Sequence, residues 1–160
     1  MHIDHRSRRK HRAVPLALLG LLVGIAPHAY AALGADESSI DHDRMQMKAE
    51  LRAKTSHAAY TVHEIQTPGG TTVREFVSAD GTVFAVTWRG PAKPDLRAVL
   101  GDSFANFVAA TATRAPGSHH HLRIDRGDLV VRSDGHMRAL FGRAYIPTLV
   151  PAGVQAEDLE

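Results

Sequence analysis

The stretch that most constrains the fold is residues 60–89, YTVHEIQTPGGTTVREFVSADGTVFAVTWR. It contains three short runs rich in Val, Thr, Phe, Tyr and Trp, which favour a pleated, half-buried surface. Two turn signals, at residues 68–70 (Pro-Gly-Gly) and 80–81 (Asp-Gly), separate the runs. The pattern predicts a three-stranded antiparallel meander. Strict alternation in the third run would place Phe84, Val86 and Trp88 on the same face.

The chain after the meander predicts one helix and one hairpin. Asp95 stands in an N-cap position and begins an amphipathic helix over residues 95–112, whose apolar positions recur at spacings of three and four. Residues 113–127 are typical of a surface loop. Residues 128–133 and 137–146 predict two strands around an Asp-Gly turn, and Gly142 indicates a bulge or a bend.

We therefore expect an α+β fold with an antiparallel sheet of about five strands. The three-stranded meander comes first, then the amphipathic helix, then a two-stranded hairpin. Residues 32–56 are polar with few apolar positions, and they predict either an arm or a further N-terminal helix. The expected core spans residues 57–150, and residues 151–160 form a tail.

Residues 1–31 are typical of a secretory signal peptide. Five basic side chains and one acid in residues 1–12 precede an uncharged apolar run over residues 13–25, and Ala29-Tyr30-Ala31 follows. That run is shorter than the roughly 20 apolar residues of a membrane span. We expect cleavage after Ala31, which would leave a periplasmic or secreted mature chain, residues 32–160, with no membrane span.

Removing the leader changes the electrostatic argument. The whole chain has 19 basic and 17 acidic residues, and subtracting five and one leaves 14 and 16, a net charge of −2. A nucleic-acid partner therefore has no support from overall charge. The chain has no cysteine, which excludes disulfides, thiol catalysis, thiolate metal sites and a lipid-modified cysteine.

Several segments of the mature chain resemble a known family. They are ALG, YTVHE, VREFVSADGTVFAVTWRGP, PDLR, DLVV, GHMRALFGRAYIP and PAGV. Together they resemble a family of small exported proteobacterial proteins catalogued as a domain of unknown function. The resemblance implies export and a single small domain, but it brings no activity and no site residue. The histidine-bearing loop at residues 119–121 departs from it.

One short block, residues 101–104 (Gly-Asp-Ser-Phe), is similar to the nucleophile block of a class of small serine esterases. That chemistry needs the serine at a strand-to-helix turn with a histidine base beside it. Ser103 instead falls within the predicted helix, and the Asp-x-x-His of that class is missing because Ser133 stands three residues before His136. We favour a small residue that lets the helix approach the sheet, and a serine hydrolase using Ser103 is the alternative.

The histidines suggest metal binding only weakly. His63-Glu64 begins like a zinc-protease motif, but the fifth position is Thr67, and neighbours on a strand point to opposite faces. His119, His120 and His121 are adjacent, and neutral imidazoles on a loop can hold Zn, Cu or Ni. No fourth ligand is identifiable, so we favour adventitious binding or none, with weak metal binding as the alternative.

Basic side chains recur on several predicted strands. They are Arg74, Arg89, Arg132, Arg138 and Arg143. They could form an anion-binding face, because guanidinium groups pair bidentately with carboxylate or phosphate. We favour the simpler interpretation, in which they pair across strands with the acids Glu64, Glu75 and Asp128.

No catalytic set survives these considerations. We therefore expect a non-enzymatic periplasmic binding or accessory module without a cofactor. Its partner would be a protein or a component of the cell envelope.

Overall fold

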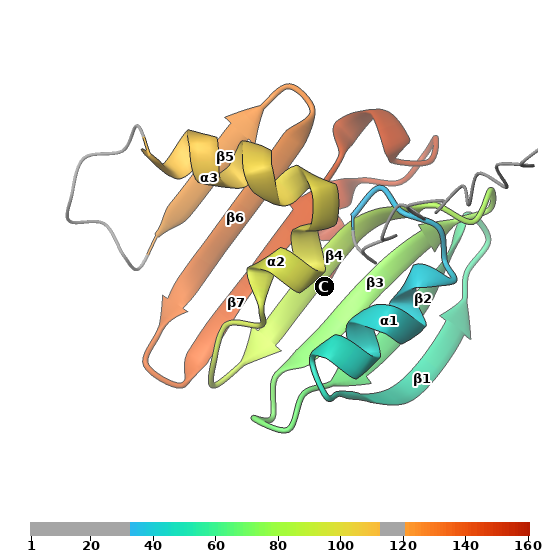
Figure 1. Ribbon diagram of the computed structural model, residues 1–160. Coiled ribbons are helices and arrows are strands. Elements are labelled where there is room, and N and C mark those ends of the chain that lie inside the picture. The colour runs from blue at the N-terminus through green and yellow to red at the C-terminus, as the bar shows by residue number, and fades with distance from the viewer. Residues whose placement is uncertain (1–32, 113–120) are drawn as a thin grey trace, which may run out of the picture.

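The computed structural model describes residues 33–112 and 121–160 (Figure 1). In these residues seven antiparallel strands form one sheet in the order β1-β2-β3-β4-β7-β6-β5. The strands are β1 (Glu50–Ser56), β2 (Tyr60–Gln66), β3 (Thr72–Ser78), β4 (Val83–Gly90), β5 (Leu122–Arg126), β6 (Leu129–His136) and β7 (Ala139–Tyr145). The helices are α1 (Ser39–Gln46), α2 (Leu96–Leu100) and α3 (Phe104–Ala112), with 3-10 turns η1 (Gly101–Ser103), η2 (Pro147–Leu149) and η3 (Ala156–Asp158). The antiparallel sheet and the mixed helix and strand content are confirmed.

The two faces of the sheet are covered differently. All three α-helices lie on one face, which we call the helix face (Figure 1). Its core includes Val86, Trp88 and Leu100, each at most 1% exposed. On the opposite face, residues 151–160 pack over an aromatic cluster that includes Phe76 and Phe84. We call this segment the C-terminal strap and this side the strap face.

The predicted meander is confirmed as β2, β3 and β4, with one irregularity. Val77 pairs with Val83 while Phe76 pairs with Ala85, so Phe84 is an extra residue on β4. Phe84 and Ala85 therefore both belong to the strap-face cluster. The expectation that Phe84 shares a face with Val86 and Trp88 was wrong, because a bulge resets the alternation.

The predicted number of strands was too low, because two edge strands lack a hydrophobic signal. β1 lies in the predicted N-terminal arm, and all seven of its residues are exposed. β5 lies in the predicted surface loop over residues 113–127, and of its five residues only Ile124 is buried. A strand with one neighbour and little burial does not need apolar residues in alternation.

The predicted helix over residues 95–112 is broken into two. Its start is confirmed, because the Asp95 side chain accepts a hydrogen bond from the Arg97 amide at 2.9 Å. Gly101 has a φ of +48° and ends α2, and η1 leads into α3. Ala98, Val99 and Leu100 of α2 are buried, whereas Phe104 and Phe107 of α3 are only partly buried against the helix-face core. The sequence pattern could not show this break, because the apolar spacing continues across it.

Gly142 on β7 lies opposite Trp88 on β4 and Ser133 on β6. The sequence predicted a bulge or a bend at this glycine, and the bulge was wrong because the pairing shows no register shift there. Close packing against the Trp88 ring explains instead why this position is a glycine. A Cβ atom at Gly142 would lie 2.3 Å from Cζ2 of the Trp88 ring.

Within the described residues, no helix is both long and apolar enough to span a membrane. The predicted signal peptide, residues 1–31, lies outside the described residues.

Candidate anion-binding groove

One row of side chains crosses the strap face through four strands. The register pairs Arg132 on β6 with Arg143 on β7, Arg143 with Thr87 on β4, and Thr87 with Arg74 on β3. Residues directly opposite each other in an antiparallel sheet point to the same face. Val131, the neighbour of Arg132, is buried in the helix-face core, so the three arginines point to the strap face.

The row lines a groove of about 440 Å³. Four of the five predicted arginines lie in its walls: Arg74, Arg89, Arg132 and Arg143. Arg138 does not line it and lies in the turn between β6 and β7. The structure therefore brings together most of the basic residues that the sequence distributes over four strands.

Arg132 and Arg143 form the most basic part of the groove. Nη1 of Arg143 donates to the carbonyl oxygens of Ala156, at 3.3 Å, and Glu157. Nε of Arg132 is buried and has no hydrogen-bond partner in the part of the chain that the structure describes. Carbonyl oxygens satisfy donors without supplying a formal negative charge. The two guanidinium groups make no ion pair in the described residues, although the Glu157 carboxylate interacts with their charges, so they can still attract an anion.

The other two arginines are engaged differently. Nε of Arg74 donates to Oε2 of Glu64 at 2.8 Å, and the two residues are direct cross-strand neighbours. This confirms the predicted pairing for Glu64. The Arg89 guanidinium lies 5.7 Å from the centroid of the Phe141 ring, to which it is paired across β4 and β7. Arg89 keeps its charge, because an aromatic face does not neutralise it.

The predicted pairing was wrong for the other two acids. Glu75 is buried on the helix face, away from the arginines. Asp128 accepts a hydrogen bond from the Asn106 amide at 2.8 Å. Cross-strand charge pairing thus accounts for only one arginine of the groove.

The C-terminal strap forms one wall of the groove through Leu159 and Glu160. It is anchored where the Tyr145 hydroxyl donates to Oε1 of Glu157 at 2.7 Å. This hydrogen bond is the main cause that lowers the pKa of Glu157, and the charges of Arg132 and Arg143 lower it further. The same strap that covers the aromatic cluster therefore also positions Arg143.

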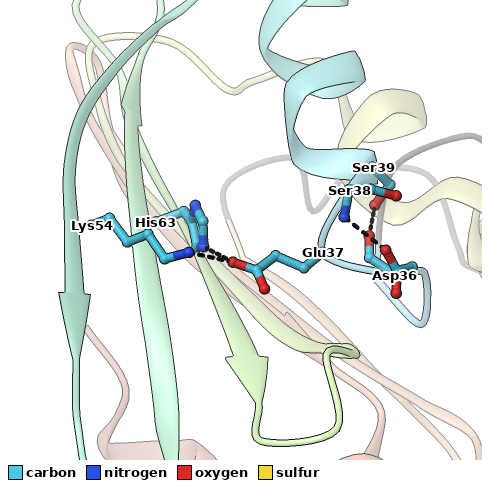
Figure 2. Close-up of polar contacts among 6 residues, drawn as sticks. All are labelled: Asp36, Glu37, Ser38, Ser39, Lys54 and His63. Carbon is cyan, nitrogen blue, oxygen red and sulfur yellow. Dashed lines mark hydrogen bonds and ion pairs between the residues drawn. The ribbon is translucent and has the colours of Figure 1, made fainter.

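A second polar cluster lies on the helix face, where the segment before α1 meets the meander (Figure 2). Oε1 of Glu37 accepts hydrogen bonds from Nζ of Lys54 at 2.7 Å and from Nε2 of His63 at 2.8 Å. The bond from Lys54 is the main cause that lowers the pKa of Glu37. Figure 2 also shows the Ser38 amide bonded to Asp36 at 2.9 Å, which starts the turn into α1. The cluster ties three segments together, so it explains a buried His63 without a catalytic role.

Two carboxyl groups are buried together beneath α1. Asp43 and Glu75 are each 1% exposed. Among the described residues, three of their oxygen atoms have no hydrogen-bond partner: both carboxyl oxygens of Glu75 and Oδ1 of Asp43. Burial is the main cause that raises the pKa of Asp43 to about 8 and that of Glu75 well above its usual value. The O–H of a protonated Glu75 donates to Asp43, and burial favours a proton on Asp43 as well below about pH 8.

The structure places Ser103, the candidate nucleophile, in a helical turn. Ser103 lies in η1 between α2 and α3 and is partly exposed. In the described residues it makes no hydrogen bond to a histidine or a carboxylate. Its position in a helical turn, rather than between a strand and a helix, fits the preferred structural interpretation.

Only one of the three clustered histidines can be placed. His119 and His120 lie outside the described residues, while Nδ1 of His121 bonds to Oδ1 of Asp134. Across residues 33–112 and 121–160, no three His, Asp or Glu side chains are grouped so that they could hold a metal ion. His63 and Glu64 point to opposite faces, because His63 bonds Glu37 on the helix face and Glu64 bonds Arg74 on the strap face.

The fold and the groove define a helix-covered antiparallel sheet with a basic groove on its other face. The chain belongs to the family described as "Protein of unknown function (DUF2844)", whose profile matches residues 29–159. No curated protein matches the chain significantly. No solved structure does so either.

Proposed function

We propose that this protein is a non-enzymatic, exported binding module that holds an anionic ligand in the groove of the strap face. The observation that carries the proposal is the adjacent pair Arg132 and Arg143, which share one groove without an ion pair to a carboxylate in the described residues. Guanidinium groups recognise carboxylate and phosphate through paired hydrogen bonds.

The residues around the groove supply binding groups more readily than a catalytic set. Thr72 and Thr87 are the hydroxyl side chains in its walls, and neither is paired with a histidine in the described part of the chain. Asp134 is already bonded to His121. Binding by charge and hydrogen bonding is therefore the chemistry that this arrangement supports best.

Arg132→Gln should weaken the binding of an anion by about tenfold or more, because a charge-assisted hydrogen bond contributes about 1.5–3 kcal/mol. The mature chain would be titrated with inorganic phosphate, sulfate and D-galacturonate at low salt, since salt screens exposed charges. Backbone amide shifts of Thr87 and Gly142 would report binding in the groove. The matched control is Arg138→Gln, which removes the same charge outside the groove.

Equal loss of affinity in the two variants, or the absence of saturable shifts with all three anions, would contradict the proposed site. The enzymatic alternative has its own test. Labelling by a fluorophosphonate probe that disappears in Ser103→Ala would overturn the non-enzymatic assignment and favour the serine hydrolase.

Export of the chain is supported by the order of basic, apolar and small residues in its first 31 positions. Intact mass spectrometry of protein from the periplasm or medium should give a chain that begins at Ala32. Recovery at full length in the membrane fraction would contradict this expectation and favour an uncleaved anchor.

A further inference from the structure

We propose that the ligand of the groove is a small hydroxylated acid, namely a sugar acid of the hexuronate class. Its carboxylate would bind Arg132 and Arg143, and its hydroxyl groups would donate to the carboxylates of the groove. This inference rests on the proposed function and specifies its ligand.

The first argument is the balance of charge in the groove. Four arginines line it, but so do three acids, Glu64, Asp134 and Glu160. The Glu157 carboxylate also interacts with the charges of Arg132 and Arg143, so the groove mixes both signs of charge and has no large positive surplus. A polyanion such as nucleic acid needs consecutive basic contacts along its backbone and would meet these carboxylates. A small ligand with a single negative charge suits such a mixed groove better than a polyanion does.

The second argument is the placement of hydrogen-bond acceptors. Glu64 on β2 is paired with Arg74, and Asp134 lies on β6 two residues from Arg132, so a carboxylate stands next to an arginine at each end of the row. An ionised carboxylate accepts hydrogen bonds and donates none. Inorganic phosphate and sulfate offer these groups few or no donors. A sugar acid offers several hydroxyl donors together with one carboxylate.

The third argument is an exposed aromatic ring at the groove. Phe141 is 46% exposed although it is large and apolar, and it lines the groove beside Arg89. Ligand sites commonly combine an apolar or aromatic surface with a few polar groups that fix orientation. The C–H face of a sugar ring can pack on such a ring. A groove of about 440 Å³ also falls in the range of small-molecule sites.

The test compares D-galacturonate with D-galactose and inorganic phosphate by the same amide-shift titration. We expect galacturonate to bind at least about tenfold tighter than phosphate, and galactose to give no saturable shift. Arg132→Gln should weaken galacturonate binding by about tenfold or more. Phe141→Leu should weaken galacturonate several-fold and leave phosphate unchanged, because it removes the flat ring without changing the charge.

The outcomes separate this inference from the proposed function. One outcome is that phosphate binds as tightly as galacturonate, that Arg132→Gln weakens the binding of both, and that Phe141→Leu weakens neither. The groove would then be a general anion site, and the sugar-acid inference would be overturned. If none of the probes shifts the groove amides, both the inference and the proposed function fail. The amide spectrum of each variant without ligand shows that it is folded.

Discussion

The free energy of unfolding should fall as the pH is raised from 5 to 9, and Asp43→Asn should remove most of this fall. The pKa of buried Asp43 is about 8, compared with 3.8 for an ordinary aspartate. A carboxyl whose folded pKa is raised binds its proton more tightly in the folded state. Its contribution to stability is fully present below the unfolded pKa and is lost as the pH rises through about 8.

The charged surroundings of the pair point in the same direction. Burial and the charge of Asp43 both raise the pKa of Glu75. The carboxylate of Asp95, at the start of α2, raises the pKa of Asp43 further. His63 is the direct cross-strand neighbour of Glu75, but its Nε2 is already bonded to Glu37. Ionising both carboxyls would thus leave a buried charge pair uncompensated, which costs several kcal/mol.

Urea unfolding at pH 5, 7 and 9 provides the measurement. We expect wild type to lose about 2 kcal/mol or more over this range, since one pKa unit corresponds to about 1.4 kcal/mol. Asp43→Asn and Glu75→Gln mimic the protonated acids and should flatten the profile. Asp41→Asn on the exposed side of α1 is the matched control and should leave the profile unchanged. The carboxyls with lowered pKa, namely Asp36, Glu37, Asp80 and Glu157, affect stability only at lower pH.

A wild-type stability that is constant or rises between pH 5 and 9 would show that burial does not keep the two carboxyls protonated. Loss of stability in Asp43→Asn at all three pH values would lead to the same conclusion, because an amide would then be a poorer partner than the native group.

The sequence predicted the centre of the sheet better than its edges. The strands β2, β3 and β4 are dense in β-branched and aromatic residues and are bounded by glycine turns, so each local signal agrees with the final fold. The edge strands β1 and β5 carry charges and little buried surface, and their pairing is decided by the neighbouring strand. The end of α2 depends on a single positive φ at Gly101, which a continuous apolar pattern conceals.

The groove was only partly predictable for a related reason. Alternation can place an arginine on one face of its own strand, but it does not give the register between β7 and the strands on either side. That register decides that Arg132, Arg143 and Thr87 form one row. The buried Glu75 was missed, although an acid between Val73 and Val77 on the apolar face of β3 is a signal that could have indicated it.

Gly142→Ala should be among the most destabilising single substitutions in the chain. The added Cβ would lie 2.3 Å from Cζ2 of Trp88 and 2.6 Å from the carbonyl oxygen of Arg132. Trp88 is 1% exposed and packed in the helix-face core, so its ring has no room to move. Overpacking of this kind costs about 1–3 kcal/mol and occasionally more, out of a total of about 5–15 kcal/mol for a typical protein.

The matched control is Gly69→Ala, where the nearest neighbour of the new Cβ is Oγ1 of Thr67 at 3.9 Å. Urea melts should show a cost of about 0.5 kcal/mol or less for this control. The double variant Gly142→Ala, Trp88→Leu should lose less free energy of unfolding than the sum of the losses in the two single variants. The smaller leucine side chain removes the clash with the ring and leaves only the clash with the Arg132 carbonyl oxygen. Arg143 follows Gly142 directly, so the displaced β7 should also weaken anion binding in the groove. If Gly142→Ala proves as mild as Gly69→Ala, then Trp88 does not lie against β7, and the alignment of Arg143 with Arg132 would lose its support.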